Sequence, residues 1–225
     1  MDKISFTVYD VFGYIIPGAL LLFAIDHFLL CPKLFNVENP TVVGGLISFS
    51  LFYIVGHMIA TPSASILETS IVKHFLKDPR MLLIRTQGKG CKLMKLFPGH
   101  FKPLPTEVRE KILSKFRLKE KQLITTYESD VIFQIAFSKV KKDEKALARL
   151  SIFLNLYGFA RNISFTCLFL ALLLLINSFF TGVWKNYYCI LSFLGVGIIM
   201  FYRFLKFYRH YTYDLYLSFL SYKEP

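Results

Sequence analysis

The stretch that decides the fold class is LFLALLLLI, residues Leu168–Ile176. A helix on the surface of a soluble protein carries a polar face, and nine consecutive apolar residues leave no room for one. The stretch lies within a longer run, Asn162–Trp184, that contains no charged residue. Crossing the hydrocarbon core of a bilayer takes roughly 20 apolar residues at about 1.5 Å each. This part of the chain is therefore predicted to be a transmembrane helix.

Three other segments have the same character. The run Asn39–Leu67 carries no charge, Asn186–Tyr202 carries none, and Val11–Pro32 carries only Asp26. Over the whole chain 54% of residues are hydrophobic and 19% are charged, against about 25% charged in an ordinary soluble domain. We therefore predict an all-α membrane protein with four transmembrane helices. They are expected at about residues 11–30, 42–62, 163–183 and 187–205.

The positive charges are unevenly placed and predict the orientation. Twenty of the 27 Lys and Arg residues lie between Pro62 and Asn162, and four more lie from Arg203 onward. Short loops that stay on the cytoplasmic side are enriched in Lys and Arg. We expect a multi-pass protein with both termini and the long middle segment in the cytoplasm.

The chain then divides into four parts. Residues 1–62 form a first transmembrane hairpin, 63–161 a basic helical cytoplasmic region, 162–207 a second hairpin and 208–225 a cytoplasmic tail. Within the cytoplasmic region, helical periodicity predicts one helix over 107–124 and a long one that begins near Glu128 and runs into the third span. One face of these helices is basic and could be simply solvated, or could contact anionic lipid, nucleic acid or a protein partner. Its residues are Arg109, Lys111, Lys115, Lys119, Lys141 and Lys142.

Small residues mark where helices are expected to pack. Gly56, Ala60 and Ala64 recur every four residues and form a stripe that allows a neighbouring helix to approach closely. In the first span, Pro17 should bend the helix, and the carbonyl that it leaves without a donor should be satisfied by a neighbouring helix. Gly13 and Gly18 should give close contact there. Such stripes favour assembly as a homo-oligomer.

Ionisable groups inside a membrane are candidates for function. Asp26 and His27 lie near the outer end of the first span, and His57 lies in the second. They could line the path of a small channel or transporter. The structural alternative is ordinary hydrogen bonding at the membrane surface, for instance between Asp26 and Tyr187 or Tyr188.

The charged residues next to the spans are Arg161, Arg203, Arg209 and His210. Arg203 and His210 match the loose RxxxxxxH spacing of some RNases, which leaves a membrane-tethered RNase as an alternative. Basic residues at these positions are also what the positive-inside rule predicts. The chain contains no HExxH motif, no Ser-His-Asp order and no catalytic carboxylate pair, so we do not predict an enzyme.

Cysteine placement gives no sign of a metal site or a disulfide scaffold. The four cysteines are Cys31, Cys91, Cys167 and Cys189, and no CxxC motif occurs. No bound metal and no cofactor are expected.

Three stretches together resemble a known kind of protein: FGYIIPGALLL (Phe12–Leu22), GHMIATPSASILE (Gly56–Glu68) and FLNLYGFARN (Phe153–Asn162). They are similar to small four-pass bacterial membrane proteins of anti-phage defence loci, such as the membrane subunit of Kiwa-type systems and the accessory membrane proteins of type VI-B CRISPR loci. The resemblance covers the spans and not the cytoplasmic middle. It implies an oligomer in the inner membrane that works with a cytosolic, nucleic-acid-acting partner and perturbs the membrane on activation.

Overall fold

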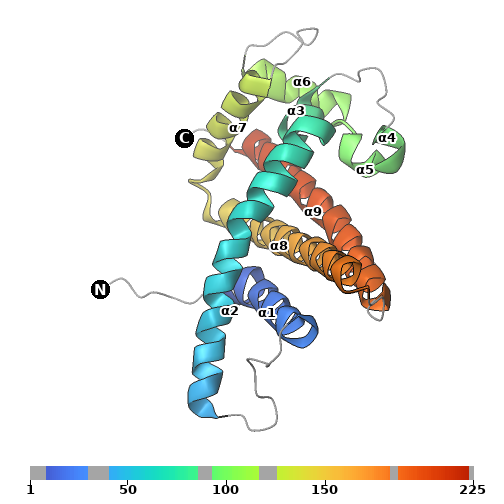
Figure 1. Cartoon of the computed structure of the whole chain (residues 1–225). Helices are drawn as coiled ribbons and strands as arrows, with labels where there is room; N and C mark the ends of the chain where they lie inside the picture. The colour runs from blue at the N-terminus through green and yellow to red at the C-terminus, as the bar shows by residue number, and fades with distance from the viewer. Residues whose placement is uncertain (1–8, 30–40, 86–92, 117–125, 183–186, 223–225) are drawn as a thin grey trace. The chain divides into compact units, whose positions relative to one another are not determined.

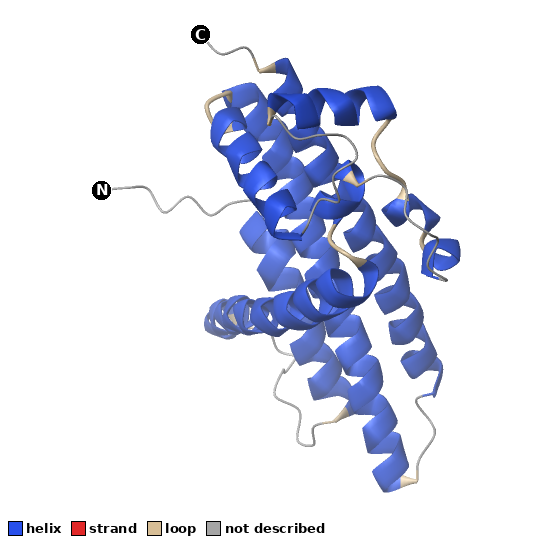
Figure 2. Ribbon diagram, turned by 90° about the horizontal axis from the view of Figure 1, so that it is seen from above, coloured by secondary structure: helices blue, strands red, loops and turns tan. Residues whose placement is uncertain are grey.

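Helices are the only regular elements in the computed structural model wherever the chain is described, which is residues 9–29, 41–85, 93–116, 126–182 and 187–222 (Figures 1 and 2). The predicted basic residue Lys119 lies outside these ranges, as do Cys31 and Cys91. Two of the segments, η1 and η2, have the wider π-helical turn. The elements are η1 (Asp10–Ile15), α1 (Ile16–Phe28), α2 (Val42–Ser63), η2 (Ala64–Leu76), α3 (Pro79–Ile84), α4 (Leu93–Leu96), α5 (Pro98–Phe101), α6 (Thr106–Lys115), α7 (Thr126–Val140), α8 (Glu144–Thr181) and α9 (Tyr187–Ser221).

Four helical stretches are long and apolar enough to cross a membrane, as expected for a multi-pass membrane protein. They are Asp10–Phe28, Val42–Ile84, Glu144–Thr181 and Tyr187–Ser221. The predicted fold class, all-α with four such helices, is confirmed. Interactions of single residues determine where two of the helices begin or end. The Thr41 side chain accepts a hydrogen bond from Gly44 N at 3.0 Å and caps α2, and Gly182, with φ +67°, follows the last residue of α8.

The chain forms two compact units. The first comprises Met1–Glu68 and Gly158–Phe204, and the second comprises Thr69–Tyr157 and Leu205–Pro225. The boundaries lie near those drawn from the sequence, with one difference. The segment treated as a C-terminal tail, residues 208–225, continues α9 as far as Ser221 and belongs to the second unit.

In the first unit, glycines let η1, α1 and α2 approach backbone to backbone. A Cβ placed on Gly18 would lie against the carbonyl oxygen of Phe52, inside any tolerable contact distance, and 2.8 Å from Gly56 N. A Cβ on Gly56 would lie against the carbonyl oxygen of Tyr14 in the same way. Both glycines are buried. Each therefore accommodates the backbone of the facing helix.

The rest of this interface is apolar. Leu21 and Ala24 of α1, Ile59 of α2 and Leu170 of α8 form a buried cluster, with aromatic and aliphatic side chains packed around it. Between α8 and α9, Ser164 Oγ donates to the carbonyl of Gly197 at 2.8 Å. All of these contacts lie within the first unit, so its helices form one packed bundle.

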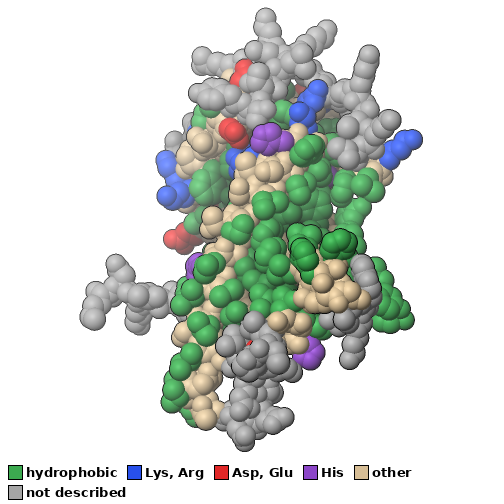
Figure 3. Space-filling model, viewed as in Figure 1, with side chains coloured by type: hydrophobic (Ala, Val, Ile, Leu, Met, Phe, Trp, Pro, Cys, Tyr) green, Lys and Arg blue, Asp and Glu red, His purple; other side chains and the backbone are tan. Residues whose placement is uncertain are grey.

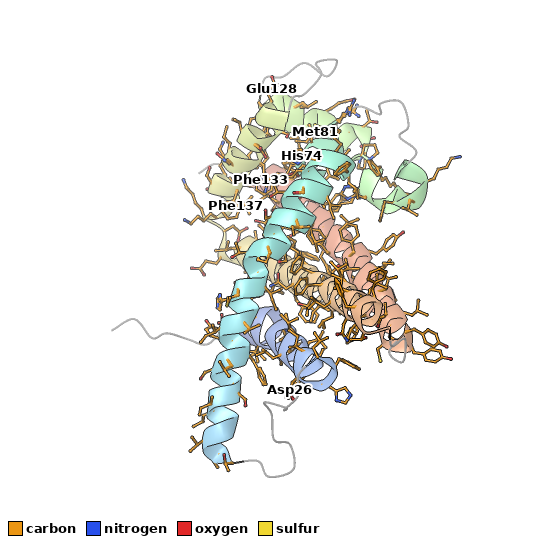
Figure 4. All side chains as sticks on the ribbon, viewed as in Figure 1. Asp26, His74, Met81, Glu128, Phe133 and Phe137 are labelled. Carbon is orange, nitrogen blue, oxygen red and sulfur yellow. The ribbon has the colours of Figure 1, made fainter. Side chains whose placement is uncertain are left out.

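The second unit has a core of its own. It draws on α3, α6, α7, the first part of α8 and the last part of α9, with Ile112, Ala136, Leu150, Leu215 and Tyr216 all almost completely buried. The Arg80 guanidinium lies 4.4 Å from the centre of the Phe133 ring and donates to Asp130 at 3.0 Å. Figure 4 shows Phe133 and Phe137 on α7. The segment between spans two and three is thus a folded helical unit.

Two details of the second unit differ from prediction. The long helix expected from Glu128 is interrupted, because α7 ends at Val140 and α8 begins at Glu144. The Asp143 carboxylate accepts hydrogen bonds from Lys145 N at 3.0 Å and Ala146 N at 3.3 Å, which starts a new helix there. From Glu144 onward the helix does run without a break into the third predicted span. The helix expected over 107–124 is described from Thr106 to Lys115.

Candidate functional site

A cluster of buried polar side chains joins three helices in the first unit. Its centre is Asn162 of α8, which is fully buried. Asn162 Nδ2 donates to the carbonyl oxygen of Gly13 at 2.8 Å, and its Oδ1 accepts from Ser63 Oγ at 2.6 Å. Because a carbonyl can only accept, the first of these bonds fixes which end of the amide faces η1. One side chain therefore ties α8 to both η1 and α2.

The bond to Gly13 has a specific cause in the sequence. In a regular α-helix the carbonyl of Gly13 would accept from the backbone N–H of residue 17, but that residue is proline and has none. A carbonyl left without a donor away from water is costly. Gly13 itself lies in the π-helical η1, and the Asn162 amide gives its carbonyl a donor from a different helix.

An ion pair completes the cluster. Arg161 Nη1 lies 3.0 Å from Glu68 Oε2, and the two side chains are only 10% and 15% exposed. Arg161 also reaches Asn162 Oδ1 from Nε and Nη2, at 3.3 Å each. The cluster is a hydrogen-bonded junction between helices. Its members among the described residues are one amide, one hydroxyl and one ion pair.

The sequence pointed to parts of this cluster only. Arg161 was predicted as a residue next to a span, and Gly13 and Pro17 as packing positions, whereas Ser63, Glu68 and Asn162 were not singled out. For the ion pair, the sequence does contain a signal in the positions of the two charges. Glu68 is the first charge after the second charge-free run and Arg161 is the last before the third, so antiparallel spans bring them to the same level. The partner of the Gly13 carbonyl had no such signal.

The predicted packing residues lie as follows. Gly13, Pro17, Gly18 and Gly56 are buried, and a Cβ on Gly13 would lie 2.8 Å from the Tyr9 ring. Ala60 and Ala64 are half-buried.

The predicted polar residues of the spans differ in their burial. Asp26 is 5% exposed at the end of α1 (Figure 4), whereas His27 and His57 are exposed. His57 stacks on the Tyr14 ring, with ring centres 3.8 Å apart. Tyr187 and Tyr188 are exposed and contact each other.

The residues of the RNase alternative both lie on α9. Arg203 and His210 are exposed and lie two turns apart on α9, about 10 Å along the axis. The His210 ring stacks on Phe153 with centres 6.0 Å apart. Arg209 donates to the backbone carbonyls of Gly99 and Lys102, so it holds the α5 region in place.

Lysines remain exposed on the second unit. Lys111, Lys115, Lys141 and Lys142 are exposed as predicted for a basic face, and Figure 3 shows Lys and Arg side chains on this unit while hydrophobic side chains cover the long helices. One member was predicted wrongly. Arg109 is 6% exposed, because it lies on the side of α6 that carries the buried Ile112 and Leu113.

Several acidic groups of the second unit are engaged in internal contacts. Asp78 caps α3 by accepting from Arg80 N at 2.8 Å, and it also accepts from the Tyr208 hydroxyl at 3.1 Å. Asp130 pairs with Arg80, and Asp143 caps α8. Around the α7–α8 turn the exposed Lys141 and Lys142 are followed by the exposed carboxylates of Asp143 and Glu144 and by Lys145.

His100 is the buried titratable group of the α5 region. Its Nε2 lies 3.1 Å from the carbonyl of Lys77, which requires the proton on Nε2, and its Nδ1 has no hydrogen-bond partner in the described part of the chain. The pKa of His100 is lowered to about 4, mainly by burial and also by the Arg209 charge, and the bond to Lys77 offsets part of this shift. The ring is therefore neutral at physiological pH.

This pKa predicts acid sensitivity. The unfolded chain takes up a proton near pH 6.5 and the folded chain only near pH 4, so stability falls as pH falls between these values. Between pH 7.5 and pH 5 the loss should be about 2 kcal/mol. The measurement is thermal unfolding of the chain in detergent at both pH values. His100→Gln keeps a donor near the Nε2 position and cannot titrate, so it should unfold with a visibly flatter pH dependence. Equal slopes for the two proteins would contradict the assignment.

Among the described residues no group of three His, Cys, Asp or Glu side chains could hold a metal ion. Comparisons of the chain with protein-family models, with curated proteins and with solved structures found no match.

Proposed function

We propose that this chain is a non-enzymatic, oligomeric inner-membrane component of a prokaryotic anti-phage defence system. In this function the first unit anchors the chain in the bilayer. The second unit lies in the cytoplasm and recruits or regulates a partner that acts on nucleic acid. Both termini are cytoplasmic, and activation perturbs the membrane. The resemblance of the spans to membrane proteins of defence loci supports the biological setting, and the charge distribution supports the orientation.

The observation that carries the recruiting role is the exposed basic surface of the second unit. We define this surface as three exposed lysines of the second unit, Lys111 in the middle of α6 and Lys141 and Lys142 in the α7–α8 turn. They lie on a unit with its own buried core, so the charges are presented by a folded scaffold. Such a surface attracts nucleic acid, or a protein with an acidic face, and accelerates its association.

The test is a phage challenge of a sensitive bacterial host that carries the native locus. Deletion of this chain should abolish protection. Reversal of the basic surface with Lys111→Glu, Lys141→Glu and Lys142→Glu should reduce protection by about tenfold or more, because three attractions become repulsions. The control carries the same change at Lys73, Lys95 and Lys102, which are equally exposed lysines elsewhere on the unit.

Membrane fractions must contain each variant at the level of the original chain, since surface charge changes of this kind alter stability by about 0.5 kcal/mol or less. Unchanged plating efficiency after deletion, across a panel of phages, would refute the defence role. Equal loss of protection in the control would refute the assignment to this surface. A monodisperse monomer by light scattering in detergent would refute the oligomer.

A further inference from the structure

A pocket of about 480 Å³ opens in the second unit where α6, α7 and α9 meet. Lys115 and Phe116 line it from the end of α6, and Ile135 and Lys139 from α7. Phe219 and Tyr222 line it from the end of α9. Sites for small molecules in proteins typically enclose about 300–1,000 Å³, so the pocket is large enough for a small organic ligand.

The charge in the pocket is positive. Lys115 Nζ lies 3.2 Å from the carbonyl of Phe219 and 3.3 Å from that of Leu220, so it caps the negative end of α9. The ammonium groups of Lys115 and Lys139 lie 4.9 and 5.8 Å from the centre of the Phe219 ring. A helix C-terminus contributes about half a negative charge, which two ammonium groups exceed. The charged side chains among the described residues that line the pocket are these two lysines.

The walls supply flat apolar surface beside these charges. Phe116 stacks on Phe219 with ring centres 5.3 Å apart and planes 26° apart, which fixes its orientation. Phe116 and Tyr222 are only half-buried, and Ile135 is 39% exposed, so all three keep side-chain surface available to an occupant. Aromatic side chains of this kind stack on the bases of nucleic acids and nucleotides. Lysine ammonium groups bind phosphate as point charges.

We propose that this pocket binds a nucleoside phosphate, with its phosphate at Lys115 and Lys139 and its base against Phe116, Tyr222 and Ile135. Two features of the pocket lining carry this assignment, namely the two lysine ammonium groups close together and the exposed ring surface beside them. The inference goes beyond the recruiting function, because it makes the second unit responsive to a small molecule. It does not depend on that function, since the pocket and the basic surface of Lys111, Lys141 and Lys142 share no residue.

The experiment measures binding of four compounds to the full chain in nanodiscs of neutral phosphatidylcholine by isothermal titration calorimetry. AMP carries both recognised groups, adenosine carries only the base, and ribose 5-phosphate and inorganic phosphate carry only the anion. AMP should bind saturably and at least about tenfold more tightly than each of the other three. Equal binding of AMP and inorganic phosphate, or no saturable binding of AMP, would overturn the proposal.

Variants separate the two halves of the pocket. Lys139→Gln should weaken the binding of AMP by about tenfold and leave the binding of adenosine unchanged. Tyr222→Ala should weaken the binding of AMP and of adenosine to a similar degree. The matched control is Lys102→Gln, an exposed lysine of the same unit that does not line the pocket, with an expected change below about twofold. Since Tyr222 is at the end of α9 and outside the buried core, at least this variant should fold even if Lys139→Gln does not. AMP affinity that neither variant changes would overturn the assignment to this pocket.

Discussion

Gly18→Ala is expected to destabilise the first unit by about 2–3 kcal/mol, although alanine is the better helix former. The added Cβ would meet the carbonyl oxygen of Phe52 and the backbone nitrogen of Gly56. Backbone atoms of a packed helix cannot turn aside as a flexible side chain can. The first two spans would have to separate, and the apolar contacts of Leu21, Ala24 and Ile59 would loosen with them.

The measurement is unfolding of the purified chain in mixed micelles at increasing mole fraction of SDS, followed by circular dichroism. Gly45→Ala is the matched control, because it lies in α2 and a Cβ there meets nothing within 4 Å. It should be neutral or slightly stabilising. Gly56→Ala should resemble Gly18→Ala, and the double variant should lose less than the sum, because one separation of the helices relieves both clashes. If Gly18→Ala and Gly45→Ala unfold at the same SDS content, the close approach at Gly18 is wrong.

Glu68→Ala should cost about 3 kcal/mol, because it leaves the mostly buried Arg161 guanidinium without its carboxylate. Arg161→Ala should cost a similar amount, and it also removes the two contacts with Asn162 Oδ1. The double variant Glu68→Ala with Arg161→Ala should lose clearly less than the sum. A coupling energy of at least about 1 kcal/mol is expected from the double-mutant cycle.

The comparison pair is Arg149 with Asp214 in the second unit. Its atoms are 4.0 Å apart and the Arg149 side chain is 62% exposed, so Arg149→Ala should cost less than about 0.5 kcal/mol. The same SDS titration measures all of these proteins. Strictly additive losses at Glu68 and Arg161 would mean that the two side chains do not form a pair in the folded protein.

The sequence alone predicted those helices that are determined by the residues within them. Charge-free runs of sufficient length predicted four apolar helices, and the structure contains them. The interruption at residues 141–143 was missed because Asp143 competes as a helix cap, an effect that hydrophobic periodicity does not record. Arg109 was assigned to the basic face of its helix, opposite the apolar face of Val108, Ile112 and Phe116. Its burial depends on which side of α6 faces the core.

The polar cluster was harder to predict because it is built from long-range contacts. Ser63, Glu68 and Asn162 are individually unremarkable in sequence, and their role arises only when α2, η2 and α8 meet. The pocket residues Lys115, Lys139 and Tyr222 come from three separate helices and share no sequence pattern. Residues that belong to a local motif can be predicted from the sequence. Residues that come together from separate helices can be identified only once the fold is known.

The bond from Asn162 to the Gly13 carbonyl makes two distant positions dependent on each other. An amide at 162 is needed because residue 17 is proline, and proline at 17 is tolerated because residue 162 is an amide. A chain with Pro17→Ala would recover a backbone donor for that carbonyl and could then lose the amide at little cost. The order of substitutions therefore matters. If Pro17 is replaced first, position 162 can accept an apolar residue. If Asn162 is replaced first, the Gly13 carbonyl oxygen loses this donor inside the helix bundle.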